Sequence, residues 1–220
     1  MKIKFLLFLL LAGCSVKTFA QSGFPFDNEI RAFKHQDSLN FPKSNGILFI
    51  GSSSIRKWDD LEQRFPGKPI IKRGVGGCEL SQLVKYYTPY ILFPYHPAKI
   101  FIYAGENDLA TGQESVDSVF KNVQALWTII STNLPDAKIY FLSIKPAPSR
   151  ISIEQDELKA NDRIKNYLKD KPNTLFIDVS TVIYKPGTIE PDPSLFQEDM
   201  LHLNSKGYDR WQKILEPYVN

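Results

Sequence analysis

The clearest signal of the fold is one stretch of nine residues, Gly46-Ile47-Leu48-Phe49-Ile50-Gly51-Ser52-Ser53-Ser54. Its first half is an apolar run, and its second half is a tight turn of small polar residues. A short, near-continuous apolar run is typical of a strand that is buried on both faces of a parallel sheet. Runs of the same kind recur at four later places, namely Pro69–Lys72, Ala98–Ala104, Ala137–Ile144 and Thr174–Asp178.

Segments with helical spacing lie between these runs. Apolar residues from Val116 to Ile130 follow the i, i+3, i+4, i+7 rule, and similar patterns surround Ile164 and Trp211, with a further one near Ile30 before the first strand. Alternating strands and helices predict a three-layer α/β/α domain. We expect five parallel strands in the flavodoxin-like order 2-1-3-4-5, by analogy with doubly wound folds.

Four polar blocks each follow the end of an expected strand. They are Gly51-Ser52-Ser53-Ser54, Gly74-Val75-Gly76-Gly77, Gly105-Glu106-Asn107-Asp108 and, after the fifth strand, Asp199-Met200-Leu201-His202. In open α/β sheets, ligands bind beyond the carboxyl ends of the strands. Residues more than a hundred positions apart are therefore expected to meet in one crevice.

Composition limits the classes of function. The 220 residues are 43% hydrophobic, which is enough for one domain with a sizeable core. The formal net charge is +3, but the first 20 residues hold three lysines and no acid, and the remainder is balanced. The sequence therefore gives no support for binding nucleic acid. No set of His, Cys or carboxylate residues has metal-ligand spacing, so neither a metal nor a cofactor is implied.

The first 20 residues are expected to be a signal peptide. A basic start precedes an apolar run from Phe5 to Ala12 that is too short to span a bilayer. Thr18-Phe19-Ala20 fits a cleavage site, which would leave residues 21–220 as a single domain. Leu11-Ala12-Gly13-Cys14 instead resembles a bacterial lipobox, which would end the signal before a lipidated Cys14. Both alternatives predict export from a bacterial cytoplasm, to the periplasm or medium or as an anchored lipoprotein, with membrane contact only through Cys14.

The three histidines can be compared as candidate bases. His35 lies among polar residues of the expected first helix, and His96 lies in a turn before the third strand. His202 lies at the expected ligand edge, three residues after Asp199, a spacing that lets the carboxylate bond the imidazole. Such an acid fixes the tautomer and stabilises the imidazolium. His202 is therefore the best-placed base for activating a hydroxyl nucleophile.

The remaining polar blocks are ambiguous by themselves. Three consecutive serines could cap a helix beginning near Ile55, or one of them could present its hydroxyl at the turn. Gly77 could offer its N–H to a substrate carbonyl, and Asn107 could donate to an oxyanion. Asp108 is expected to hold its own turn. Cys78 is expected to be a small buried residue rather than a nucleophile.

Together, these blocks resemble the SGNH hydrolases, also called the GDSL lipase/esterase family, over nearly the whole chain after Gly46. The stretch from Ile47 to Trp58 looks most like the platelet-activating-factor acetylhydrolase-like branch. The resemblance implies that Ser53 is the nucleophile of a triad with His202 and Asp199, and that Ser53, Gly77 and Asn107 form the oxyanion hole. Ser52 departs from the family, which usually has aspartate beside the nucleophile.

The expected function is that of an exported serine esterase acting on a small-molecule ester, an acylated sugar or lipid. By resemblance, short acyl groups such as acetyl on carbohydrate are expected. The segments Lys145–Ser152 and Tyr184–Glu198 follow the fourth and fifth strands, so they should wall the crevice, and they carry Arg150 and Phe196. The alternatives are a lysophospholipase or thioesterase of the same family, and a catalytically silent binding lipoprotein on the same fold.

Overall fold

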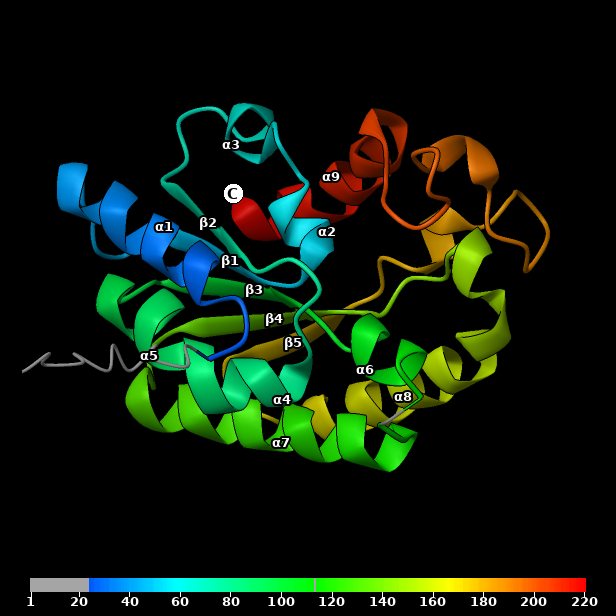
Figure 1. Cartoon of the computed structure of the whole chain (residues 1–220), viewed down its shortest axis with the longest axis horizontal. Helices are drawn as coiled ribbons and strands as arrows, with labels where there is room; N and C mark the ends of the chain where they lie inside the picture. Colours follow the sequence, from blue (N-terminus) through cyan, green and yellow to red (C-terminus); the bar gives the residue numbers. More distant parts are fainter. Residues whose placement is uncertain (1–23, 113) are drawn as a thin grey trace, which may run out of the picture.

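The computed structural model describes residues 24–112 and 114–220, so the expected signal segment and Cys14 lie outside the described residues. Five parallel strands form one sheet in the order β2-β1-β3-β4-β5, which confirms the expected fold (Figure 1). The strands are β1 (Ile47–Gly51), β2 (Ile70–Gly74), β3 (Lys99–Tyr103), β4 (Lys138–Leu142) and β5 (Thr174–Ile177).

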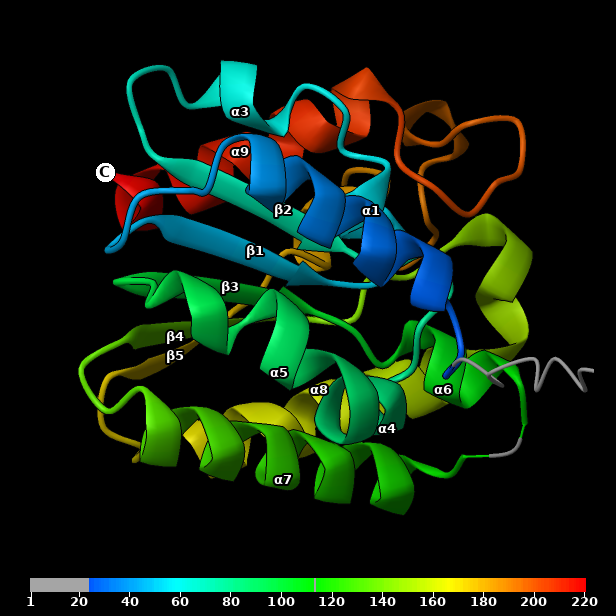
Figure 2. The same cartoon turned by 60° about the vertical axis from the view of Figure 1, so that its left-hand side comes forward.

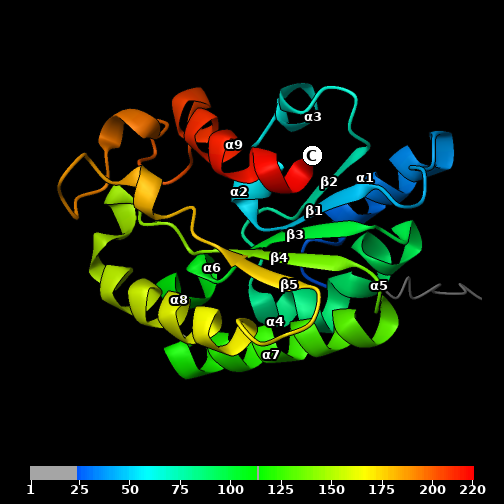
Figure 3. The same ribbon diagram turned by 180° about the vertical axis from the view of Figure 1, so that it is seen from behind.

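Helices cover both faces of the sheet (Figures 2 and 3). One face is packed by α2, α3 and α9, and the other by α1, α4, α5, α7 and α8. The helices are α1 (Asp27–Leu39), α2 (Ser53–Arg56), α3 (Leu61–Arg64), α4 (Leu80–Gln82), α5 (Thr88–Ile91), α6 (Glu106–Ala110), α7 (Val116–Asn133), α8 (Glu154–Leu168) and α9 (Ser205–Val219).

The sheet has a separate hydrophobic core on each face. All five residues of β1 are buried, and they alternate between the two cores, with Leu48 and Ile50 on one side and Ile47 and Phe49 on the other. This is why β1 is apolar throughout, since both faces of a central parallel strand are covered by helices. The buried residues of α7 repeat every three or four positions, as an amphipathic helix requires.

One helical stretch does not appear in the sequence pattern. Between β2 and β3 the chain forms α4, a π turn at Leu83–Tyr87, α5 and a 3₁₀ turn at Phe93–Tyr95. Two prolines within it, Pro89 and Pro94, remove backbone donors and break the helix into short pieces. Its buried face therefore shows no single period that a sequence reading could recognise.

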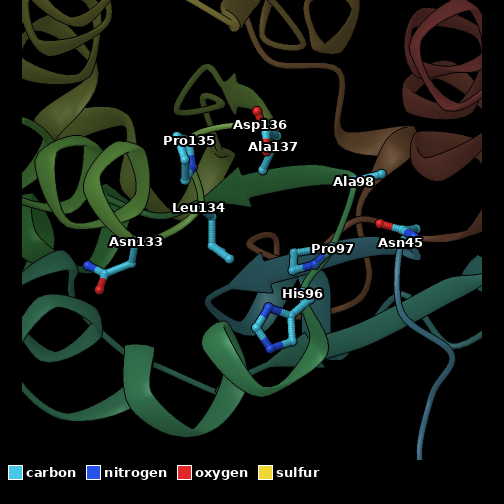
Figure 4. Close-up of a pocket in the computed structure, with 9 residues that line it drawn as sticks. All are labelled: Asn45, His96, Pro97, Ala98, Asn133, Leu134, Pro135, Asp136 and Ala137. Atoms are coloured by element: carbon cyan, nitrogen blue, oxygen red, sulfur yellow. The ribbon is translucent and has the colours of Figure 1, made fainter.

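The amino ends of the parallel strands form one edge of the sheet and the carboxyl ends form the opposite edge, and the two edges have different features. Figure 4 shows a pocket at the amino edge, lined by residues that precede β1, β3 and β4 and including His96 and Asn133. The four polar blocks instead follow strand ends or lie before α9, at the opposite edge. Within the described ranges, no helix is both long and apolar enough to cross a membrane.

Candidate active site

Ser53 is presented by a tight turn between β1 and α2. Gly51 ends the strand with φ +135°, and a Cβ there would lie 1.9 Å from the Tyr103 carbonyl oxygen, so a side chain is excluded. Ser52 follows at the N-cap position, and Ser53 begins the helix. Ser52 and Ser54 are buried, whereas Ser53 is partly exposed. Only one of the three serines is thus accessible from the surface.

The side-chain cap that these serines could supply is absent. Ser52 occupies the N-cap position, but its side chain accepts no hydrogen bond from the first turn. The short α2 is instead held by its own backbone bonds and by burial of Ile55.

Ser53, His202 and Asp199 form a hydrogen-bonded chain. The Ser53 Oγ atom lies 2.8 Å from His202 Nε2, and His202 Nδ1 lies 2.6 Å from Asp199 Oδ2. A carboxylate only accepts, so Nδ1 carries the proton, and Nε2 is left to accept the hydroxyl hydrogen of Ser53. Side chains 149 residues apart are thereby joined in the arrangement that activates a hydroxyl nucleophile.

Asp199 is fixed by the loop that carries it. Its Oδ1 atom accepts the backbone N–H groups of Leu201 (3.0 Å) and His202 (2.9 Å). Met200, between Asp199 and Leu201, adopts a left-handed φ of +52° in this tight loop. Burial alone would raise the pKa of Asp199, but the bonds from the backbone and ring of His202 and from Leu201 outweigh it and hold the pKa well below its usual range. The carboxylate is therefore charged at neutral pH.

Lys57 is a basic neighbour of this pair that the sequence reading missed. It directly follows α2, and its Nζ atom lies 3.5 Å from Asp199 Oδ2 and 3.1 Å from His202 Nδ1. Lysine has only donors, so with Nδ1 protonated its hydrogen bond goes to the carboxylate. Lys57 therefore joins the end of α2 to the acid–histidine loop.

Gly77 and Asn107 line a common pocket at this edge. Gly77 is exposed in a turn with φ +78°, and among the described residues no acceptor takes its N–H. Asn107 lies in the first turn of α6, and its Nδ2 donates to the Cys78 carbonyl at 3.1 Å. The second hydrogen of that amide nitrogen remains for a substrate oxygen.

A buried ionic group lies behind the pocket. Lys145 is fully buried, and its Nζ atom lies 3.3 Å from both carboxylate oxygens of Glu106. Tyr103 donates its hydroxyl to the same carboxylate at 2.7 Å. The sequence holds one sign of this buried pair, because Lys145 is a charged residue in a mostly apolar run after the fourth strand.

Several residues outside the hydrogen-bonded chain can also be compared with what the sequence predicts. His35 and His96 are exposed, and Cys78 is buried as expected; burial raises the pKa of its thiol. Asp108 bonds its own backbone, as expected, but its carboxylate also accepts the Leu80 N–H from another segment at 3.0 and 3.1 Å. Phe196 is buried in a core and does not wall the crevice.

The pocket wall formed by the turn after β4 is as expected, with Ser149, Arg150 and Ser152 lining the pocket. Among the described residues, no group of three His, Cys, Asp or Glu side chains is arranged to hold a metal ion. The chemical groups gathered here are thus a hydroxyl, an imidazole–carboxylate pair, N–H donors and an arginine.

Comparisons with known proteins place the chain among ester hydrolases. The family model of the GDSL-like lipase/acylhydrolase family matches residues 50–210. Platelet-activating factor acetylhydrolase IB subunit alpha2 of Rattus norvegicus is 24% identical over 184 residues, covering 80% of this chain and 77% of the relative.

Solved structures show the same fold. A GDSL-like lipase from Bacteroides thetaiotaomicron has a TM-score of 0.74 at 21% identity and covers 86% of this chain and 96% of its own. A mutant of an acetyl-xylooligosaccharide esterase from Geobacillus stearmophilus has a TM-score of 0.62 at 14% identity, with coverages of 81% and 96%.

Proposed function

Because the chain belongs to the GDSL-like lipase/acylhydrolase family and is an ester-hydrolysing serine hydrolase, we propose that Ser53, His202 and Asp199 are its catalytic triad. The observation that carries this proposal is the hydrogen-bonded chain of these three side chains, with distances of 2.8 and 2.6 Å. Its geometry matches what a serine nucleophile needs, which is a base within reach and an acid that orients the base.

In the first step, Ser53 Oγ attacks the ester carbonyl carbon while His202 Nε2 takes the hydroxyl proton. The charge of Asp199 stabilises the imidazolium that forms. The carbonyl oxygen becomes an oxyanion, which the N–H groups of Ser53 and Gly77 and the amide of Asn107 stabilise. Such donors act only on charge that develops in the transition state, so they raise kcat.

In the second half of the reaction, the imidazolium gives its proton to the departing alcohol, and the carbonyl re-forms as an acyl-serine. Water then enters, His202 takes one of its protons, and hydroxide adds to the acyl carbon. Collapse of this second tetrahedral intermediate breaks the bond to Ser53 Oγ, which regains its proton from His202. The products are a carboxylic acid and the free serine.

We propose short acyl groups, chiefly acetyl, on a carbohydrate alcohol as the substrate class. The pocket beside Gly77 and Asn107 is lined mainly by polar and small residues, including Ser149, Arg150 and Ser152. A long acyl chain would need an apolar channel. The acetyl-xylooligosaccharide esterase that shares this fold acts on an acetylated sugar by name, which supports the same choice here.

A panel of 4-nitrophenyl esters from acetate to palmitate, followed by peracetylated sugars, tests this proposal. We expect kcat/KM to fall as the acyl chain grows beyond about four carbons, and acetate to be released from the sugars. Preference for long chains would replace the short-acyl proposal by that of a lysophospholipase or thioesterase. Absence of turnover in folded protein would favour a binding module.

We also propose that the protein is exported, because the first 20 residues carry lysines, an apolar run and no acid. Fractionation of cells that express the full chain, with Cys14→Ala as the comparison, tests this. Release from membranes by the substitution would indicate a lipid anchor, and retention in the cytoplasm would contradict export.

A further inference from the structure

Arg150 holds a fixed position beside the proposed catalytic groups. It lies in the 3₁₀ segment Pro148–Ile153 after β4, and its side chain lines the pocket that Gly77 and Asn107 share. Both the N–H and the hydroxyl of Ser149 donate to the Met200 carbonyl oxygen, at 3.1 and 2.9 Å. The segment that carries Arg150 is thus tied directly to the loop that carries Asp199 and His202.

Arg150 differs from every other arginine of the chain in its partners. Six of the seven arginines form an ion pair with a carboxylate, and all seven lie in the described ranges. Among the described residues Arg150 forms no ion pair; its charge acts only at longer range on the buried Glu157, whose pKa burial raises and Arg150 lowers. It makes only two long bonds to uncharged oxygens, at 3.4 Å to the Glu106 carbonyl and 3.5 Å to Asn107 Oδ1. Most of its five N–H donors are therefore unused.

The surroundings of Arg150 suit a small polar group with negative charge. The pocket has a volume of about 430 Å³, and hydroxyl-bearing Ser149 and Ser152 lie on the same wall as the guanidinium. A guanidinium fork matches the oxygens of a carboxylate or phosphate, and such charge-assisted bonds are shorter and stronger than neutral ones. The half-buried guanidinium of Arg150 has donors that no described residue accepts, and these suit an anionic group in the pocket.

We propose that Arg150 binds an anionic group on the alcohol part of the ester, so that the preferred substrates are acylated acidic sugars. This proposal rests on the proposed function. A short acyl group such as acetyl has no room for a charged group, so the negative charge must lie on the alcohol part of the ester. Carboxylate and phosphate groups share the required chemistry. The substrate is then held at two points, with its carbonyl at Asn107 and its anion at Arg150.

A second role for Arg150 makes a different prediction. Its bond to Asn107 Oδ1 orients the amide, and losing only this bond would slow every ester to the same extent. Losing an anion contact slows charged esters selectively. The ratio of kcat/KM between charged and uncharged substrates therefore separates substrate binding from positioning of Asn107.

The test compares three acetylated sugars of similar size, namely O-acetylglucose, O-acetylglucuronate and O-acetylglucose 6-phosphate. We expect wild-type kcat/KM to be about tenfold or more higher for at least one charged sugar than for the neutral one. Arg150→Gln should bring this ratio close to one, whatever loss its contact with Asn107 causes equally in all three sugars, and Arg150→Lys should restore part of the ratio. The larger of the two charged rates identifies carboxylate or phosphate as the preferred group.

Arg163→Gln is the matched control, since Arg163 of α8 pairs with Asp117 of α7, neither residue lines the pocket, and its loss should leave the ratio unchanged. Equal rates for charged and neutral sugars in wild type, or an equal loss for all three in Arg150→Gln, would overturn the proposal. Binding of glucuronate and glucose 6-phosphate to Ser53→Ala, with and without Arg150→Gln, reads the anion site without turnover. Anion binding that depends on Arg150 but without ester cleavage would overturn the proposed function and leave the anion site standing.

Discussion

The Lys145 Nζ atom donates a 2.8 Å hydrogen bond to the carbonyl oxygen of Leu201, the residue directly before His202. The same ammonium group is paired with Glu106, the residue directly before Asn107. One buried lysine therefore connects the loop of the proposed base to the loop of a proposed oxyanion donor. The distance between these two loops depends on a charge pair that solvent does not reach.

Replacing Lys145 by methionine should lower both stability and kcat. Removing one member of a buried ion pair leaves an uncompensated charge, which costs about 3–5 kcal/mol of unfolding free energy. Urea unfolding and ester kinetics below the transition measure both effects. Lys159→Met, at an exposed surface pair with Asp156, is the control and should change stability by less than about 1 kcal/mol. The double variant Lys145→Met/Glu106→Gln should regain part of the loss, and no regain would contradict the charge argument.

Asn107→Ala should lower kcat by about a hundredfold to a thousandfold with little change in KM. The amide would act on the oxyanion, which exists only in the transition state, and loss of one such donor has this magnitude in other hydrolases. Steady-state kinetics on 4-nitrophenyl acetate provide the measurement. A larger effect on KM than on kcat would show that Asn107 binds the ground state instead.

Asp108→Asn should stabilise the protein increasingly as pH rises from about 4 to 7. Burial raises the pKa of Asp108 to about 7, against an unfolded value near 3.8, despite the bond from the Leu80 N–H. Ionisation is therefore easier in the unfolded chain, and wild-type stability falls as pH rises between these two values. The difference in unfolding free energy between Asp108→Asn and wild type should grow over this window and level off above it.

The exposed Asp170→Asn is the matched control and should show no such trend. If the stability difference for Asp108→Asn were the same at pH 4.5 and pH 8, the raised pKa would be wrong.

Cys78→Ala should leave ester hydrolysis within about threefold of wild type. The thiol is buried, its pKa is raised by burial, and it lies 3.4 Å from the Gly51 carbonyl, so it is neither ionised nor exposed. A loss of about 1–2 kcal/mol in stability is expected from the space left in the core. Rapid inactivation of the native enzyme by iodoacetamide would show that the thiol is accessible after all.

The fold was predictable because its strands have a clear signal. Runs such as Ile47–Ile50 are apolar on both faces, and the amphipathic helix from Val116 onward repeats regularly, so their order along the chain predicts a doubly wound sheet. The broken helices between β2 and β3 were not predictable, because Pro89, Pro94 and a π turn destroy the period. Which helix covers which face follows from the strand order, since right-handed crossovers place the connection from β1 to β2 on one face and the later connections on the other.

The sequence predicted which polar blocks form the candidate site, but not the distances and contacts between their side chains. Placing each block after a strand end brought Ser53 and His202 to one edge, and the structure brings them to 2.8 Å. The roles of Lys57 and Lys145 depend on contacts between segments 142 and 56 residues apart, which no local pattern shows. The bond between Asp108 and Leu80 was not predictable for the same reason, since Leu80 lies in another segment.

A fluorophosphonate probe, which reacts covalently with an activated serine, tests whether Ser53 is the nucleophile. We predict one covalent adduct per chain, mapped by peptide mass spectrometry to Ser53, with ester hydrolysis lost in proportion to labelling. Ser52→Ala and Ser54→Ala, at the two buried neighbours, should still be labelled, whereas folded Ser53→Ala should be neither labelled nor active. Labelling at another residue, or full esterase activity in Ser53→Ala, would contradict the account.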